Sequence, residues 1–352
     1  MQLLKKLKIS KKYIGEGMQT ESILKSMEQK KERILYYDLL KIIAAFLVVF
    51  YHFSFYKLDY DFSVNVPYYP NVNRIIMCFA ACSVPLFFMI NGILLFNKTR
   101  TVKSIYKKAF KILILLLIWN IFKFPSWFLK TLIILYLLFP LFQYLYHNQF
   151  RIYLLIICLL FIFPFTYNLV ILILKVHGIN LNINFSGLID ISIKDLNATG
   201  LFTMYSLFYF LIGPILKKKT LNKYFSILMI VIGLALVLLE CIGYTNLYQC
   251  IYDGVNSSFP TIGAVFLSFG VFFLVKEFNF ERFDKIIVLF GSNVLTVYLL
   301  HMLFIILFDN LVTLSNYNLI TCLFISIIIY LICTLIGIYA SKIPLVNYFF
   351  KI

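Results

Sequence analysis

The run RILYYDLLKIIAAFLVVFYH, residues 33–52, decides the fold of this chain. It is long and apolar enough to cross a bilayer as one α-helix, which needs about 20 residues, yet it contains an aspartate, a lysine and a histidine. Helical periodicity places Lys41 and His52 on one face, and Asp38 lies one turn before Lys41 near the same face. Because ionisable side chains are costly inside a membrane, each of the three is a functional candidate.

Nine further apolar runs follow this one along the chain. The chain is 62% hydrophobic and only 13% charged, which excludes a soluble globular protein of this length. We therefore expect an all-α, polytopic integral membrane protein with about ten transmembrane helices. The expected spans are Ile34–Tyr56, Ile75–Phe96, Ala109–Phe124, Trp127–Tyr146, Ile152–Leu174, Leu201–Leu216, Tyr224–Tyr244, Phe259–Val275, Ile286–Phe308 and Leu319–Ala340.

The charges predict the orientation of these spans. The net charge of +17 gathers in short loops that follow every second span, and the opposite loops carry acidic residues such as Asp59 and Asp190. Basic loops face the cytoplasm, so we expect both termini there and no nucleic-acid partner. A multi-pass protein of the plasma membrane follows. Its richness in Ile, Lys, Asn, Phe and Tyr points to an AT-rich, bacterial genome.

The chain divides into two expected parts. Residues 1–33 form a basic cytoplasmic tail that contacts anionic lipid, and residues 34–352 form the transmembrane domain. The tail lacks the cleavage site of a secretory signal. Cys78 and Cys82 have a spacing seen in metal sites, but no histidine or carboxylate lies near them in sequence, so we interpret them as packing residues and predict no metal site.

A second membrane histidine, His301, ends the run SNVLTVYLLH at residues 292–301. The expected topology places His301 and His52 at similar depths, so the two side chains could line one cavity, with Tyr298 one turn from His301. Other readings stay open. Asp38 and Lys41 could form an interfacial salt bridge that fixes helix depth, and either histidine could serve packing or a structural hydrogen bond.

At these residues the chain resembles the membrane-bound acyltransferase 3 family, whose members O-acetylate cell-surface glycans. The resemblance rests on five motifs in the family's order and covers the chain from about Arg33 to its end. The motifs are YDLLKIIA at 37–44 followed by His52, VPLFFMING at 84–92, KAFK at 108–111, the group WFL, YL and PL at 127–129, 136–137 and 140–141, and YLLH at 298–301.

The resemblance implies an acetyl-CoA-dependent O-acyltransferase acting on a hydroxyl of a cell-surface or lipid-linked glycan. It implies His52 and His301 as catalytic residues, with Lys41, Lys108 and Lys111 facing the donor's phosphates. The supporting residues are Asp38, Asn91 and Tyr298. Acetyl-CoA is then a substrate, and no cofactor is permanently bound. The expected partners are membrane lipid, a glycan or polyprenyl-linked saccharide acceptor, and other proteins of glycan biosynthesis.

The chain departs from the family pattern at several positions. Lysine replaces arginine at Lys41, Lys108 and Lys111, and Asn91 replaces a serine. A carboxylate that some members carry near the tryptophan motif is missing, and Glu240 is a speculative substitute. The rival hypothesis is a polysaccharide exporter or flippase without acyl transfer, and a third is an inactive scaffold. The acceptor, the acyl chain, the oligomeric state and the choice between direct and acyl-enzyme transfer stay open.

Overall fold

The computed structural model describes residues 34–57, 76, 78–121, 127–179, 204–248, 261–278, 280–311 and 318–344. Contacts divide the chain into Met1–Leu35 and Tyr36–Ile352. The expected basic tail, residues 1–33, lies outside the described residues. The following description concerns Tyr36–Ile352.

All the regular structure in the described residues is helical, as the sequence predicts. The first half of the chain contains α3 (Leu35–Lys57), η2 (Phe79–Cys82), α5 (Ser83–Phe96), α6 (Val102–Ile121), α7 (Trp127–Asn148), α8 (Phe150–Phe161), the π-turn η3 (Ile162–Thr166) and α9 (Tyr167–Val176). The second half contains α11 (Met204–Lys217), α12 (Lys223–Tyr248), α13 (Ile262–Glu277), η5 (Glu281–Phe283), α14 (Asp284–Ser292), α15 (Val294–Leu311) and α16 (Leu319–Ala340).

A helix occupies each of the ten expected spans, but fewer are long and apolar enough to cross a membrane alone. Within the described residues five pass that test, and a sixth span results if the bent pair α14 and α15 is counted as one. Short length and charge both contribute to the difference, since α11 has 14 residues and α13 has 16, whereas α6 has 20 residues but carries several lysines. The all-α membrane class is confirmed, whereas ten spans and cytoplasmic termini stay predictions.

Large apolar side chains remain exposed along several helices. Leu117 on α6 is 58% exposed, Leu239 on α12 is 64% exposed and Phe324 on α16 is 62% exposed. A helix with apolar side chains on its outer face suits lipid as its solvent. The helices thus offer one apolar face to lipid and another to their neighbours.

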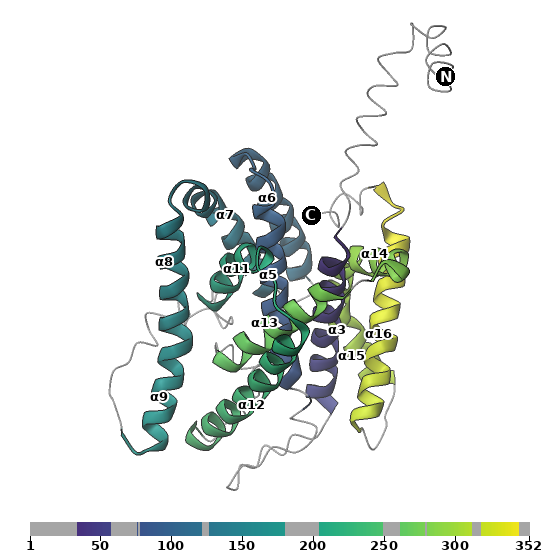
Figure 1. Cartoon of the computed structure of the whole chain (residues 1–352). Helices are drawn as coiled ribbons and strands as arrows, with labels where there is room; N and C mark the ends of the chain where they lie inside the picture. The colour runs from purple at the N-terminus through teal and green to yellow at the C-terminus, as the bar shows by residue number, and fades with distance from the viewer. Residues whose placement is uncertain are drawn as a thin grey trace, which may run out of the picture. The chain divides into compact units, whose positions relative to one another are not determined.

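Glycines bring α5 and α11 into direct backbone contact. A Cβ added to Gly92 would collide with the carbonyl oxygen of Phe210, and one added to Gly213 would collide with the carbonyl oxygen of Met89. Small residues permit this approach, which supplies van der Waals contact where lipid gives no hydrophobic drive for association. Gly233 of α12 approaches α13 in the same way, and the two helices lie side by side (Figure 1).

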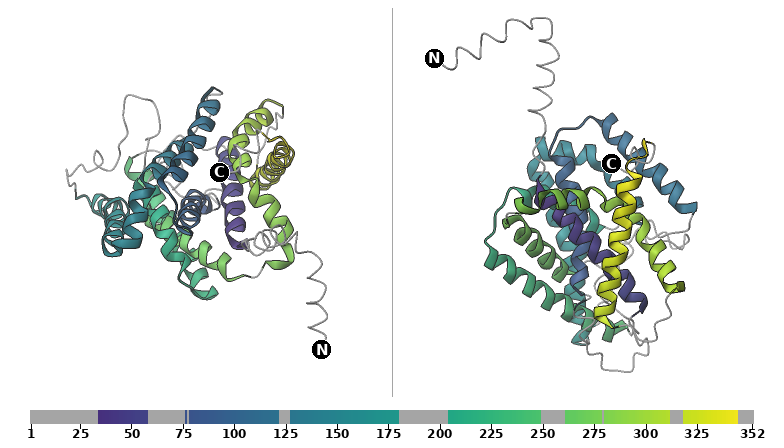
Figure 2. Two further views of the ribbon diagram at one scale, coloured as in Figure 1. Left: turned by 90° about the horizontal axis from the view of Figure 1, so that it is seen from above. Right: turned by 90° about the vertical axis from the view of Figure 1, so that its right-hand side faces the viewer.

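Helix α3 lies beside α15 and α16, as Figures 1 and 2 both show. The rings of Phe46 on α3 and Tyr330 on α16 meet edge to face with centroids 6.1 Å apart. On another side, Tyr36 meets Phe272 of α13 with centroids 6.2 Å apart. The polar stripe of α3 is thereby enclosed by late helices of the chain.

A break at Asn293 separates α14 from α15 and bends the pair by 60°. The Asn293 side-chain amide donates to the carbonyl of Leu289 at 2.7 Å, which satisfies a carbonyl at the end of α14. Helix α16 packs closely here, because a Cβ on Gly337 would lie 2.7 Å from the side-chain oxygen of Asn293. The bend directs α15, which carries His301, along α3.

Cysteine-accessibility labelling in intact cells tests the orientation. We expect single cysteines at Lys103 and Lys218 to react only after the membrane is permeabilised, because basic loops stay in the cytoplasm. We expect cysteines at Asp59 and Asp190, which lie outside the described residues, to react in intact cells. Finding Lys103 and Asp59 on the same side would refute the expected span order.

Candidate functional site

The N-terminal part of α3 carries a buried ion pair. The Lys41 ammonium donates to the Asp38 carboxylate at 3.0 Å, and the Asp38 side chain is 3% exposed while that of Lys41 is 23% exposed. Both residues belong to one helix, one turn apart, so their pairing follows from the local sequence. The pair lets an apolar helix carry a carboxylate at low cost, since an unpaired buried charge is far more expensive.

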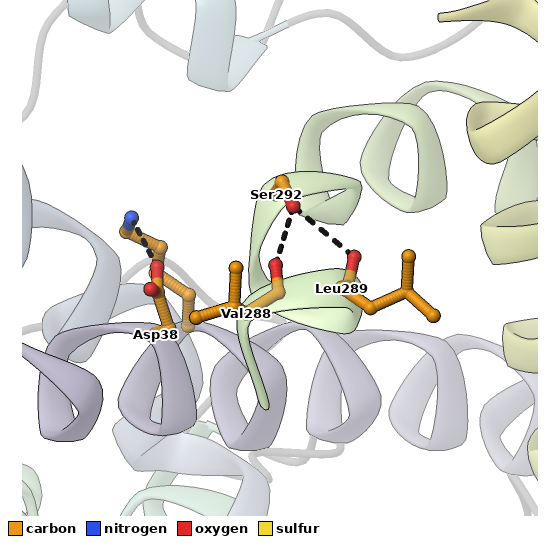
Figure 3. A network of polar contacts seen from close by, with 5 residues as sticks. Asp38, Val288, Leu289 and Ser292 are labelled. Carbon is orange, nitrogen blue, oxygen red and sulfur yellow. Dashed lines mark hydrogen bonds and ion pairs between the residues drawn. The ribbon is translucent and has the colours of Figure 1, made fainter. Parts of the chain in front are cut away.

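The Asp38 side chain also lies against α14. Figure 3 shows it beside the turn formed by Val288, Leu289 and Ser292, whose hydroxyl donates to the carbonyl of Leu289 at 3.2 Å and also to that of Val288. A Cβ added to Gly291 would stand 2.5 Å from the Asp38 Cβ and 3.0 Å from its carboxylate oxygen. Glycine at position 291 therefore makes room for the carboxylate, two residues before the bend.

His52 and His301, which the sequence places on different spans, meet in the structure. Their ring centroids lie 5.4 Å apart, with the ring planes inclined by 35°. His52 is partly exposed, whereas His301 is only 3% exposed. Helical periodicity in α3 and α15 thus brings two imidazoles from opposite ends of the chain to one place.

The backbone of α15 fixes the tautomer of His301. Its Nδ1 lies 2.6 Å from the carbonyl oxygen of Tyr298 and 3.1 Å from that of Val297. Carbonyl oxygens only accept hydrogen bonds, so Nδ1 carries the proton and Nε2 keeps its lone pair. Nε2 is buried and has no hydrogen-bond partner among the described residues. A buried acceptor without a partner is rare in proteins and calls for an explanation.

Aromatic side chains hold this part of α15 in position. Tyr298 lies 5.9 Å from His301 and 5.1 Å from Phe128 of α7, measured between ring centroids. The indole of Trp119 on α6 donates to the carbonyl of Leu299 at 3.0 Å. Helices α6 and α7 therefore contact α15 within one turn of the histidine, and the Trp–Phe–Leu motif contributes Phe128 to the site.

The Asn91 side chain forms a hydrogen bond within its own helix. Its side-chain amide donates to the carbonyl of Phe87 at 2.9 Å, one turn earlier on α5. Glu240, the speculative substitute for a missing carboxylate, is 3% exposed and accepts from the backbone N–H groups of Ile262 at 3.1 Å and Gly263 at 3.2 Å. A carboxylate at a helix N-terminus satisfies free N–H groups there. Capping of α13 therefore accounts for Glu240 without a catalytic role.

Lys108 and Lys111 lie on α6 before most of its apolar residues, and both are partly buried. Burial lowers the pKa of Lys108, and the nearby charges of Arg100 and Lys111 lower it further. Lys107, next to Lys108 in sequence, is exposed on another side of the helix. The two lysines of the KAFK motif therefore belong to a cluster of cations that faces the protein.

Arg100, which the sequence analysis did not single out, belongs to this cluster of cations. Arg100 follows α5, and its backbone N–H donates to the Gln143 side chain of α7 at 3.0 Å, while the Gln143 amide donates back to the Arg100 carbonyl at 3.1 Å. The only arginine between positions 75 and 150 stands among lysines. An arginine among lysines is a weak signal of a specific role, and the sequence does not reveal its partner on α7.

The two cysteines with metal-like spacing are buried beside η2, and the Cys82 thiol donates to the carbonyl of Phe79 at 3.1 Å. The described residues contain no group of three or more His, Cys, Asp or Glu side chains placed to hold a metal ion.

Substitution of Gly291 by alanine tests the contact with Asp38. The added methyl group would overlap the Asp38 side chain, so we expect α14 to shift and the free energy of unfolding to fall by about 1–3 kcal/mol, the usual cost of overpacking. Thermal unfolding of purified protein measures this. Gly243→Ala on α12 is the matched control, because an added Cβ there would meet only the flexible end of the Leu172 side chain, at 3.0 Å or more. Equal unfolding temperatures for both variants and the unchanged protein would refute the contact.

The chain matches the sequence model of one protein family. A sequence model described as an acyltransferase domain matches residues 34–126 and 120–341. No curated protein and no solved structure matches the chain. The matched ranges contain both histidines, the Asp38–Lys41 pair, the KAFK motif and Tyr298, and they cover most of the chain. The chain therefore belongs to the acyltransferase 3 family.

Proposed function

We propose that this protein transfers an acetyl group from cytoplasmic acetyl-CoA to a hydroxyl of a cell-surface or polyprenyl-linked glycan. The observation that carries the proposal is the histidine pair, with ring centroids 5.4 Å apart and a buried, unpartnered Nε2 on His301. Acyl transfer to an alcohol requires a base for the hydroxyl proton, and neutral imidazole is the side chain most often used. Family membership supports acyl transfer in general.

The two imidazoles suit different parts of the reaction. His52 is partly exposed and can take the proton of the acceptor hydroxyl as its oxygen attacks the thioester carbonyl. The new C–O bond forms, the C–S bond breaks, and His52 returns the proton to the departing thiolate of CoA. His301 has its proton fixed on Nδ1, so its Nε2 can accept a hydrogen bond from the His52 ring after a small rotation and orient that base.

The basic residues at the predicted cytoplasmic end suit the donor. Lys41 bonds Asp38 but remains 23% exposed, and an ammonium has three donors, so it retains N–H groups for a phosphate. Lys108 and Lys111 offer two further ammonium groups one turn apart on α6. Asp38 acts by holding Lys41 and α14, and Tyr298 packs against His301. Asn91 supports α5 through its bond to Phe87.

The same proposal also implies where in the cell the reaction takes place. Acetyl-CoA is consumed as a substrate, and membrane lipid surrounds the helices whose apolar side chains are exposed. The plasma membrane of a bacterium, with other glycan-biosynthesis proteins supplying the acceptor, is the compartment that joins a cytoplasmic donor to a surface glycan.

Substitution of either site histidine by glutamine tests this function. We expect His52→Gln to lower acetyl transfer by about 10²–10⁴-fold, the usual contribution of a general base, with the amount of folded protein unchanged. His301→Gln should lower it less, because His301 orients the base. The measurement is transfer of labelled acetyl groups from acetyl-CoA to alkali-labile esters in membrane vesicles whose cytoplasmic face is outward.

His177→Gln is the matched control, since His177 is exposed and also bonds a backbone carbonyl one turn earlier. It should transfer acetyl groups at the normal rate. Release of free thiol from acetyl-CoA distinguishes the acyltransferase from the rival hypothesis of an exporter, because an exporter releases none. Near-normal transfer by His52→Gln would refute the assignment of the base.

A further inference from the structure

Arg100 is fixed in place by more bonds than a loop residue usually makes. Its backbone exchanges two hydrogen bonds with the Gln143 side chain, at 3.0 and 3.1 Å. Its guanidinium donates from Nη2 to the carbonyl of Leu94 at 3.2 Å. Both the backbone and one end of the side chain are thus held before any ligand arrives. Such preorganisation reduces the entropy that binding would otherwise cost.

The other donors of this guanidinium are not all used. Arg100 Nε is buried and has no hydrogen-bond partner among the described residues. Leaving a charged donor unpaired in a buried position costs free energy. An acceptor with two oxygens can bond the Nε edge and an Nη group of one arginine together, as phosphate does. The fixed position and the unused donor therefore favour an anionic ligand.

Neighbouring positive charges also favour an anionic ligand at this place. Lys108 and Lys111 lie close enough to perturb one another electrostatically together with Arg100, and burial with this crowding lowers the pKa of Lys108. Within the described ranges no ion pair joins Arg100 or Lys108 to a carboxylate. Like charges held together in a partly buried place destabilise the protein until a counter-charge binds. The cluster thus has an excess of positive charge that a dianion would neutralise.

We propose that Arg100, together with Lys108, binds the phosphate groups at the nucleotide end of the acyl donor. The identity of the nucleotide rests on the proposed function. Gln143 is a positioning residue in this site, because it holds the backbone of Arg100 and contributes no charge.

The length of α6 agrees with this assignment. From Lys108 to Trp119 the helix rises by roughly 16 Å, at about 1.5 Å per residue. Trp119 bonds the carbonyl of Leu299, two residues before His301. The cation cluster and the histidines thus lie at opposite ends of one rigid helix. A donor whose phosphates bind at one end can extend its long, flexible arm toward the other, where the thioester reacts.

Exposure distinguishes this site from a surface for lipid headgroups. Lys103 and Lys107 on the same helix are exposed, whereas Lys108 and Arg100 are partly buried. An anionic lipid would meet the exposed lysines first, since headgroups attract basic residues at the membrane surface. We therefore assign the protein-facing pair to a soluble phosphate ester.

Nucleotide binding by the purified full-length protein in nanodiscs tests the proposal without any acyl transfer. The probe is adenosine 3′,5′-bisphosphate, measured by calorimetry in zwitterionic lipid. We expect Arg100→Gln to weaken binding by about 10-fold or more, the value of one charge-assisted hydrogen bond. The affinity of Arg100→Lys should lie between those of Arg100→Gln and the unchanged protein, because lysine keeps the charge but loses the paired N–H donors of the planar guanidinium. Lys107→Gln, which removes the same charge beside Lys108, should change binding by less than about 2-fold.

Gln143→Ala gives a second, charge-neutral test. It should weaken binding several-fold by freeing the Arg100 backbone, with a smaller salt dependence of the loss than in Arg100→Gln. Unfolding temperatures are measured on each variant, and Arg100→Lys keeps the test valid if Arg100→Gln does not fold. Equal affinity in Arg100→Lys, Lys107→Gln and the unchanged protein would overturn the proposal. Loss of nucleotide binding when phosphatidylglycerol replaces zwitterionic lipid would also overturn it, because lipid is then the ligand.

The assay separates this site from the proposed function. If Arg100→Gln weakens nucleotide binding while acetyl transfer is never found, the phosphate site stands and the transfer reaction falls. If acetyl transfer depends on His52 while Arg100→Gln leaves nucleotide affinity unchanged, the proposed function stands and the phosphate site is refuted.

Discussion

The contact between the Asp38 carboxylate and Gly291 determines how the two histidines meet. Asp38 and His52 share α3, and Gly291 lies two residues before the bend that starts α15. Once the carboxylate is seated against α14, the direction of α15 relative to α3 is constrained at their inner ends. His301, on α15, then lies with its ring 5.4 Å from that of His52. One close contact of the Asp38 side chain with the backbone of α14 thus constrains the arrangement of the helices that carry the two histidines.

Burying this carboxylate in a membrane protein requires compensation. Lys41 supplies it at 3.0 Å, from a side chain that keeps some exposure at the predicted inner boundary. Replacing an ion pair by apolar residues often costs nothing in stability, so an ion pair is weak support for a stabilising role. Its value here lies in geometry, because an apolar residue at position 38 gives α14 no fixed position. Asp38 and Lys41 can therefore form a structural salt bridge and support the site at the same time.

Sequence periodicity predicted what depends on one helix and missed what depends on contacts between helices. The shared face of Lys41 and His52, and the turn joining Tyr298 to His301, follow from about 3.6 residues per turn. Hydropathy located the ten regions where the described helices of expected spans lie, but it reports composition over a window, so it could not detect that α11 and α13 are short or that α14 and α15 bend at Asn293. Glu240 was a speculative substitute for a missing carboxylate, because its partners, the first N–H groups of α13, lie on another helix and cannot be read from the sequence.

Arg100 illustrates the same limit. Its role depends on Gln143, more than forty positions away, and on a guanidinium nitrogen whose burial no local pattern encodes. Position 100 reads as one more basic residue of an inner loop until α7 places an amide against its backbone. Motif comparison pointed to Lys108 and Lys111 because KAFK matches a motif of the family, and Arg100 lies outside that motif.

Two buried nitrogen atoms that lack a hydrogen-bond partner lie near the two ends of α6. Arg100 Nε is a donor without an acceptor, and His301 Nε2 is an acceptor without a donor. Several tyrosine and serine hydroxyls are also buried without partners in the described residues, but a hydroxyl can rotate to find one, whereas these two nitrogens are held by backbone bonds on the same side chain. Persistent unsatisfied groups are costly in a folded protein and are retained where a ligand satisfies them. The phosphates of the proposed donor complement Arg100 Nε at one end, and the N–H of the His52 ring complements His301 Nε2 at the other.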